Sequence, residues 1–200
     1  MKFRLLLLIC AALAIALAWR DRIEFELGYA YANGDFHGLP LPRDDARAAY
    51  WLRLAAAEDH PRAQYLLGLQ YAHGWGVRHD DAQAAQWFDR AARRNYAPAA
   101  FHLAWMLHKG EGAAADRPRA LRLMQQAAGQ DMAAAQMALG RFHERGEGVA
   151  TDPVLALQWY RRASDTAGKQ PARFDNARVA AQATAARDRL ARQIAQQPGN

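Results

Sequence analysis

Histidine is the residue type in this sequence best suited to metal or acid–base chemistry. The chain has seven histidines, His37, His60, His73, His79, His102, His108 and His143. A helical zinc hydrolase needs an HExxH pair, but the stretch FHERG around His143 lacks the second histidine. No G-x-S-x-G nucleophile motif occurs, and no glycine-rich phosphate loop follows a strand. We therefore expect no catalytic residue, no metal ligand and no cofactor.

The glycines mark an internal repeat instead. Gly74, Gly110 and Gly146 are 36 residues apart, and Gly76, Gly112 and Gly148 keep the same period. Asp80, Asp116 and Asp152 follow at that spacing, as do Ala91, Ala127 and Ala163. A period of 20 to 50 residues is typical of a solenoid, whose units are too small to bury their own apolar faces alone.

Each unit reads as two helices joined by a glycine-containing loop. In the second unit the first helix is predicted over 63–73 and the second over 81–93. Gly74 follows the first helix, where a left-handed C-cap is easiest without a Cβ, and Asp80 takes the N-cap position of the second. Pro153, after Asp152, suits the first position of a helix.

These signals predict an all-α fold, a right-handed α-α superhelix of about four helix-turn-helix repeats with a C-terminal capping helix. Repeat one has a loop insertion of four residues, around FHGLPLP, and repeat three departs most from the pattern. The predicted repeats are 23–59, 60–95, 96–131 and 132–168, and the capping helix covers 169–196. Val179, Ala183, Ala186, Leu190 and Ile194 form its apolar face.

Glycine, alanine and tryptophan positions predict how the helices pack. Gly28, Gly68 and Gly140 are expected to allow close helix approach. Trp51, Trp87 and Trp159 are expected to fill the space between a second helix and the next first helix.

The N-terminus has the features of an export signal. Lys2 and Arg4 precede an apolar run over 5–19, and the Ala-Leu-Ala site at 16–18 predicts cleavage after Ala18. The alternative is an uncleaved membrane anchor formed by the same run. Residues 1–18 are thus a signal peptide or an anchor, and the chain is expected to be periplasmic, otherwise extracytoplasmic, or anchored in the inner membrane.

Charge and cysteine content exclude two further classes. The net charge is +6, and residues from Lys169 onward carry most of the excess, so the repeats are close to neutral. Such a chain lacks the broad basic face of a nucleic-acid-binding protein. Cys10 is the single cysteine, so disulfides are absent from a chain cleaved after Ala18.

The repeating residues carry a family resemblance. The pattern A-x-[YFM]-x-L-G-x-x-Y-x-x-G-x-G-V-x-x-D-x-x-x-A-x-x-W-x-x-x-A-A resembles the Sel-one-like repeat, a relative of the tetratricopeptide repeat, over about residues 23–168. The resemblance implies a non-enzymatic scaffold or adaptor that binds proteins or peptide segments through a curved groove. Some cysteine-rich relatives are linked to β-lactam hydrolysis, but this chain lacks their paired cysteines and an S-x-x-K motif.

Helical geometry predicts which residues line that groove. At 100° per residue, positions equivalent to 66, 69 and 73 face outward in each first helix. The stripe so defined includes Glu26, Asn33 and Ala138, and its predicted partner-binding residues are Tyr29, Leu66, Leu69, His73, His102, Trp105, Lys109, Arg141 and Arg145. Its middle is apolar and its C-terminal end is basic, so the expected partner is a protein or peptide with apolar and acidic residues. A membrane-anchored envelope regulator with the same groove is the alternative.

Overall fold

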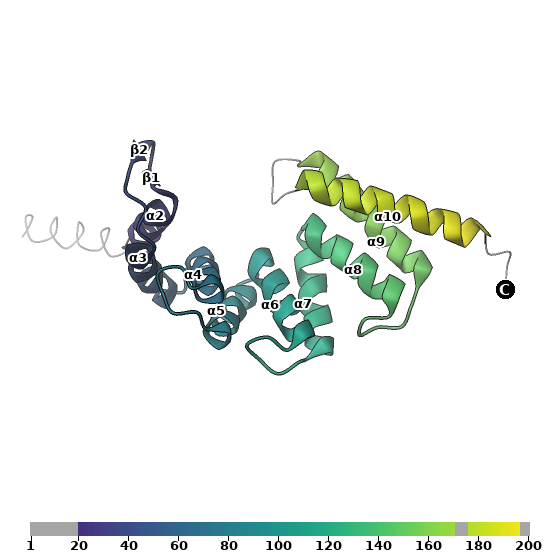
Figure 1. The fold of residues 1–200 in the computed structure, drawn as a ribbon, viewed down its shortest axis with the longest axis horizontal. Helices are drawn as coiled ribbons and strands as arrows, with labels where there is room; N and C mark the ends of the chain where they lie inside the picture. Colours follow the sequence, from purple (N-terminus) through teal and green to yellow (C-terminus); the bar gives the residue numbers. More distant parts are fainter. Residues whose placement is uncertain (1–19, 171–175, 197–200) are drawn as a thin grey trace, which may run out of the picture. The chain divides into compact units, whose positions relative to one another are not determined.

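A computed structural model describes residues 20–170 and 176–196, and this part of the chain is almost entirely helical (Figure 1). The predicted signal or anchor over 1–18 lies outside the described residues. The helices are α2 (Arg20–Asn33), α3 (Asp45–Ala57), α4 (Pro61–His73), α5 (Asp81–Arg93), α6 (Ala97–Lys109), α7 (Arg117–Gly129), α8 (Ala133–Arg145), α9 (Pro153–Lys169) and α10 (Asn176–Gln196). The predicted all-α helical repeat fold is confirmed.

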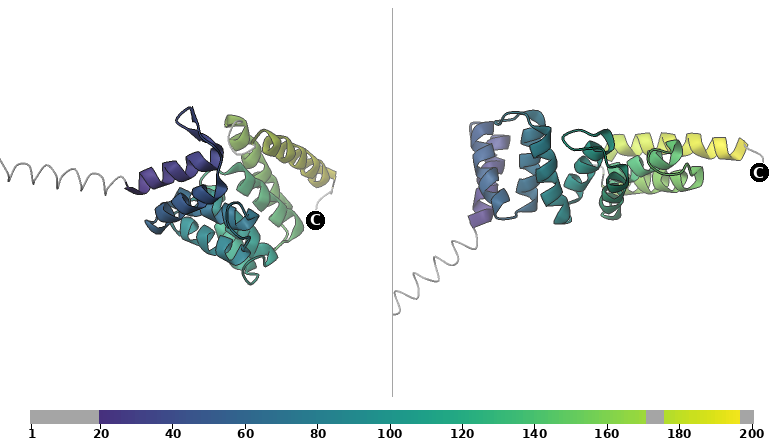
Figure 2. Two further views of the ribbon diagram at one scale, coloured as in Figure 1. Left: turned by 60° about the vertical axis from the view of Figure 1, so that its left-hand side comes forward. Right: turned by 90° about the horizontal axis from the view of Figure 1, so that it is seen from below.

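The chain forms two compact units that divide after Arg94. In the first unit α2 packs on α3, α3 on α4 and α4 on α5. In the second unit α6 packs on α7, α7 on α8 and α8 on α9, and α10 covers α9 and α8. Figure 2 shows the helices of each unit lying side by side. Each unit therefore holds two helix pairs, and the second also holds the terminal helix.

The insertion in repeat one is a small hairpin. Its strands are β1 (Asp35–Phe36) and β2 (Leu39–Pro40), paired antiparallel. Gly38 lies at its tip with a φ of 84°, in the left-handed region that glycine adopts easily. The four extra residues thus lengthen the turn between α2 and α3 without breaking either helix.

Aspartate caps begin the second helix of every repeat, as predicted. The carboxylates of Asp44, Asp80, Asp116 and Asp152 accept the backbone N–H three residues further on, at 2.8–2.9 Å. Pro153 occupies the first turn of α9. Each cap satisfies an N–H group that has no partner inside the helix and complements the helix dipole.

Glycine ends the first helix of repeats two, three and four in the predicted left-handed conformation. The φ angles are 72° at Gly74, 77° at Gly110 and 73° at Gly146. Gly76 has a φ of 66°, and a Cβ there would lie 2.0 Å from the Asp45 carbonyl oxygen. The second glycine of the loop is therefore required both by conformation and by space.

The residue after each tryptophan fills the core, contrary to the prediction for the tryptophans themselves. Trp51, Trp87 and Trp159 are only half-buried. The large, fully buried side chains of the second helices are Leu52, Phe88, Met124 and Tyr160, again 36 residues apart. One position along a helix turns a side chain by about 100°, which directs these residues at the first helix of their own repeat.

The terminal helix α10 packs with the apolar face that its sequence predicts. Val179, Ala183 and Leu190 are buried, and Ile194 and Ala186 pack beside Tyr160 at the edge of the core. The Asn176 amide, at the start of α10, donates to the Gln170 carbonyl at 2.7 Å. The last repeat is thus covered by a helix rather than left open to solvent.

Candidate functional site

The predicted outward stripe is largely exposed or half-buried, with one exception. Ala138 is only 1% exposed, because its methyl group is shorter than the Leu66 and His102 side chains at equivalent positions. Ala138 was therefore placed wrongly on an open face. The remaining stripe residues are described below for each unit separately.

The first unit has a hollow between its two first helices, α2 and α4. We call it the apolar hollow; its volume is about 270 Å³ and its lining residues are Tyr29, Ala32, Asn33, Arg43, Asp45, Leu52, Leu66, Leu69, Gln70 and Trp75. Leu52, from α3, is buried and is part of its floor. Four predicted stripe residues are thus brought together here, namely Tyr29, Asn33, Leu66 and Leu69.

Aromatic side chains stand at the edge of the apolar hollow. Trp75, in the α4–α5 loop, is 45% exposed, and its ring stacks on His73 at 4.4 Å between centroids. Tyr29 is 37% exposed, and the Arg62 guanidinium lies over its ring at 4.7 Å. Partly exposed aromatic rings held in place by neighbours are typical of surfaces that bind peptides.

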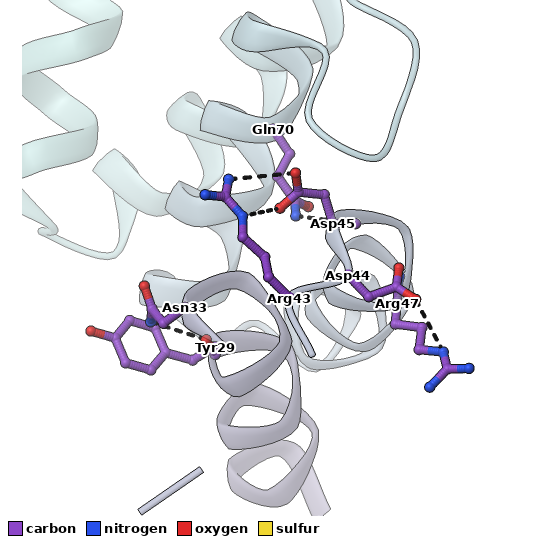
Figure 3. Close-up of polar contacts among 7 residues, drawn as sticks. All are labelled: Tyr29, Asn33, Arg43, Asp44, Asp45, Arg47 and Gln70. Atoms are coloured by element: carbon purple, nitrogen blue, oxygen red, sulfur yellow. Dashed lines mark hydrogen bonds and ion pairs between the residues drawn. The ribbon is translucent and has the colours of Figure 1, made fainter. Parts of the chain in front are cut away.

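Polar contacts hold one side of the apolar hollow in shape (Figure 3). Arg43 Nε donates to Asp45 Oδ1 at 3.1 Å, and the Gln70 amide donates to the Asp45 carbonyl at 3.4 Å. The Asn33 amide donates to the Tyr29 carbonyl at 3.0 Å. The first two bonds join the segment after the hairpin, the start of α3 and α4, and the third lies within α2.

The second unit has a hollow of about 230 Å³ between α8 and α10. We call it the basic hollow; its lining residues are Met137, Arg141, Glu144, Arg145, Tyr160, Gln182, Ala186 and Arg189. Two predicted stripe residues, Arg141 and Arg145, lie here. Gln182, Ala186 and Arg189 come from α10.

The two hollows occupy equivalent positions in their repeats. Arg141 is at the repeat position of Tyr29, and Arg145 at that of Asn33. Tyr160, on the floor of the basic hollow, is at the position of Leu52. Helix α10 borders α8 as α4 borders α2. Both units thus have a hollow at the same place in the repeat, but its lining is mainly apolar in the first unit and cationic in the second.

A hydrogen-bonded chain crosses the basic hollow. The Tyr160 hydroxyl donates to Glu144 Oε2 at 2.6 Å, and Arg189 Nη2 donates to Glu144 Oε1 at 2.6 Å. Burial, and then the bond to Glu144, raise the pKa of the Tyr160 phenol well above its usual range. Tyr160 therefore remains a protonated donor, and both oxygens of Glu144 are engaged.

The stripe residues of α6 lie in an aromatic cluster. Trp105 packs edge-on against Phe142 with centroids 5.7 Å apart, and the Arg141 guanidinium lies 5.6 Å from the centre of the indole ring. His102 contacts the Phe101 ring, and Lys109 pairs with Glu111 at 3.4 Å. Trp105 thus supports Arg141 more than it offers an open surface.

Within residues 20–170 and 176–196, no group of three or more His, Cys, Asp or Glu side chains is arranged to hold a metal ion. The described helices also include none with the length and apolar character of a membrane span.

Comparison with known families follows the repeat boundaries closely. A family model for the Sel1 repeat matches residues 24–60, 61–96, 97–132 and 133–165. The chain belongs to the Sel1 repeat family. Sel1 repeats are generally non-enzymatic scaffolds that mediate interactions between proteins.

Solved structures of Sel1 repeat proteins are similar to this chain. The Sel1 repeat protein from Oxalobacter formigenes is 28% identical with a TM-score of 0.67, over 74% of this chain and 59% of that chain. The protein c5321, a protective antigen present in uropathogenic Escherichia coli strains and displaying an SLR fold, is 30% identical with a TM-score of 0.69. That match covers 89% of this chain but 39% of c5321, so this chain spans well under two thirds of either relative. No curated protein matches the sequence.

Sequence reasoning missed the residues that close each hollow of this Sel1 repeat protein. Trp75 stands where the next repeats have Glu111 and Glu147, so an aromatic residue at this loop position is a signal in the sequence. Arg189 belongs to the basic C-terminal stretch, and its guanidinium binds Glu144 across the basic hollow. The repeat period predicts neither residue, because Trp75 lies in a loop and Arg189 lies in the terminal helix, both outside the first-helix stripe.

Proposed function

We propose that this chain is a non-enzymatic, exported Sel1 repeat scaffold that binds segments of other proteins through the hollows between its first helices. The observation that carries the proposal is the apolar hollow. Leu66 and Leu69 lie there beside the partly exposed rings of Tyr29 and Trp75. A hollow of about 270 Å³ accommodates one large apolar side chain of a bound peptide.

The interaction role typical of Sel1 repeats supports this proposal. The titratable groups of the described hollows serve ion pairs and hydrogen bonds within the fold, as with Asp45 on Arg43 and Glu144 on Tyr160. Apolar pockets with fixed polar edges are typical of peptide recognition. The function that these features favour is binding, and the partner is a protein segment with at least one apolar anchor.

The experiment is affinity capture from the native host with quantitative mass spectrometry. Trp75→Ala and Leu69→Ala should lower recovery of the bound proteins at least about tenfold, since interfaces depend on a few buried anchors. Tyr50→Ala is the matched control, because Tyr50 is an exposed aromatic residue of α3 that does not line the hollow. Equal recovery with all three variants would remove the apolar hollow from the proposal.

Export is the second part of the proposal and rests on residues 1–18. The basic start, the apolar run and the Ala-Leu-Ala site support cleavage after Ala18. Retention of the run over 5–19 would make the protein a membrane-anchored envelope regulator with the same hollows. Sequencing the N-terminus of the native protein distinguishes the two: Trp19 as the first residue indicates export, and an intact Met-Lys-Phe start indicates an anchor.

A further inference from the structure

The basic hollow holds more positive charge than its own carboxylate can balance. Arg141, Arg145 and Arg189 line it, together with the single acidic residue Glu144. Its other lining residues are uncharged. Arg145 also pairs with Glu147 beside the hollow, which leaves a local excess of one positive charge, although the repeats as a whole are close to neutral.

Glu144 is already hydrogen-bonded to residues other than Arg141 and Arg145. One of its oxygens accepts from the Tyr160 hydroxyl and the other from Arg189, each at 2.6 Å. The Glu144 side chain is only 20% exposed, so its hydrogen bonds with Tyr160 and Arg189 are partly shielded from solvent. Glu144 is thus a structural anchor of the hollow and leaves the two α8 arginines to other acceptors.

The two α8 arginines lie one helical turn apart and are available to a ligand. The Arg141 guanidinium lies over the Trp105 ring, and a cation–π contact through its flat face leaves the N–H donors at its edge for acceptors. Arg145 pairs with Glu147 at 3.4 Å, a long contact between two side chains at the surface. Exposed pairs of this kind contribute little to stability and exchange readily for a better acceptor.

We propose that the basic hollow binds a carboxylate side chain of an acidic peptide segment, held between Arg141 and Arg145. This proposal rests on the proposed protein-binding function and names the chemistry of the partner at the second unit. Guanidinium groups bind carboxylates through two parallel hydrogen bonds, which are shorter and stronger than neutral ones. The Asp or Glu residue then replaces the weak contact between Arg145 and Glu147.

Charge and size together favour a peptide carboxylate over a nucleic acid. A nucleic-acid strand presents a run of phosphates and is bound by a basic stripe that continues over several elements. Here Arg141, Arg145 and Arg189 line a hollow of about 230 Å³ between α8 and α10. The equivalent residues of the apolar hollow, Tyr29 and Asn33, carry no charge. The acidic residue of the peptide should therefore bind in the basic hollow of the second unit.

The test is selection of random dodecapeptides displayed on phage against the purified full-length chain. Peptides enriched on the wild type should carry Asp or Glu well above the library frequency. The best synthetic peptide should bind at least about tenfold more weakly once its acidic residues are changed to Asn and Gln. Its affinity should also fall as NaCl rises from about 50 to about 300 mM, because the ion pairs lie at the surface.

Two double variants identify the site. The double variant Arg141→Gln with Arg145→Gln should bind the acidic peptide about tenfold more weakly or worse. The double variant Arg141→Lys with Arg145→Lys keeps the charge but cannot form the paired hydrogen bonds of a guanidinium, so its affinity should be intermediate. Arg122→Gln with Arg161→Gln removes the same charge from exposed residues outside the hollow and should change affinity by less than about twofold. Circular dichroism of every variant checks that it is folded.

The outcomes separate this inference from the proposed function. An amide peptide that binds as well as the acidic one, or equal weakening by the Arg122 and Arg161 control, overturns the carboxylate site. Enrichment of apolar peptides alone, with binding that depends on Trp75 and does not change when Arg141 and Arg145 are substituted, would overturn the carboxylate site and leave the scaffold function intact. Failure of any peptide to enrich would count against both proposals.

Discussion

Gly68 of α4 lies so close to Phe88 of α5 that a Cβ at position 68 would be 2.6 Å from Cε1 of the ring. The same relationship joins Gly140 to Tyr160, also at 2.6 Å, and Gly28 to Leu52 at 2.7 Å. Each glycine therefore receives the large buried residue of its own repeat. Glycine at this position is explained by packing, since none of the three adopts a positive φ.

Substitution of Gly68 by Ala should destabilise the protein. Alanine favours a helix over glycine by about 1 kcal/mol, but the added methyl group displaces the buried Phe88 ring, and overpacking of this kind costs about 1–3 kcal/mol. We expect a net loss of up to about 2 kcal/mol in the free energy of unfolding, measured by urea denaturation.

Gly129→Ala is the matched control for Gly68→Ala. Gly129 ends α7, and a Cβ built there has no atom within 4 Å among the described residues. Only the difference in helix propensity applies, so this variant should be as stable as the wild type or up to about 1 kcal/mol more stable. A loss at Gly129 equal to that at Gly68 would contradict the packing explanation.

The N-cap of α5 provides a second prediction. Asp80→Ala removes the acceptor that holds the Gln83 N–H at 2.9 Å, and should lower the free energy of unfolding by about 1 kcal/mol. Asp80→Ser retains a capping oxygen and should recover most of that loss, as thermal unfolding followed by circular dichroism will show. If Ser at this position is no better than Ala, the capping bond does not stabilise the helix.

The period predicted those features that depend on one repeat alone. Asp80, Gly74 and Pro153 act through backbone groups within a few residues of themselves, so the spacing suffices to place them. Gly68 was also predicted to allow close helix approach. Its partner Phe88 was not predicted, because the sequence analysis assigned the neighbouring Trp87 to the core instead. One residue of helical rotation separates the two, which is finer than a periodic pattern alone can resolve.

The hollows were predicted only in part, because each requires contacts between elements far apart in the sequence. The stripe gave Leu66 and Leu69 correctly as neighbours on one helix. Arg43 occupies the repeat position of His79, and its contact with Asp45 beside α4 does not follow from the period. Arg189 comes from the terminal helix, which has no counterpart in the repeats.

The Tyr160 hydroxyl offers a prediction that depends on pH. Tyr160→Phe removes the 2.6 Å bond to the Glu144 carboxylate and should lower the free energy of unfolding by about 2 kcal/mol near neutral pH. Burial and the bond to Glu144 raise the pKa of the folded phenol above its unfolded value of 10.0. The stabilisation linked to the proton is complete below about pH 10 and is lost as the pH rises further, because the unfolded tyrosine ionises first.

The difference in free energy of unfolding between wild type and Tyr160→Phe should therefore be constant from about pH 7 to about pH 9. Above about pH 10 it should shrink by roughly 1.4 kcal/mol for each pH unit, because the folded protein keeps a proton that the unfolded chain has released. Urea denaturation at each pH, followed by tryptophan fluorescence, measures the difference, and the other tyrosines cancel because both proteins contain them. A difference that stays flat to about pH 11.5 would show that Tyr160 ionises alike in both states, and that the Glu144 bond does not hold its proton.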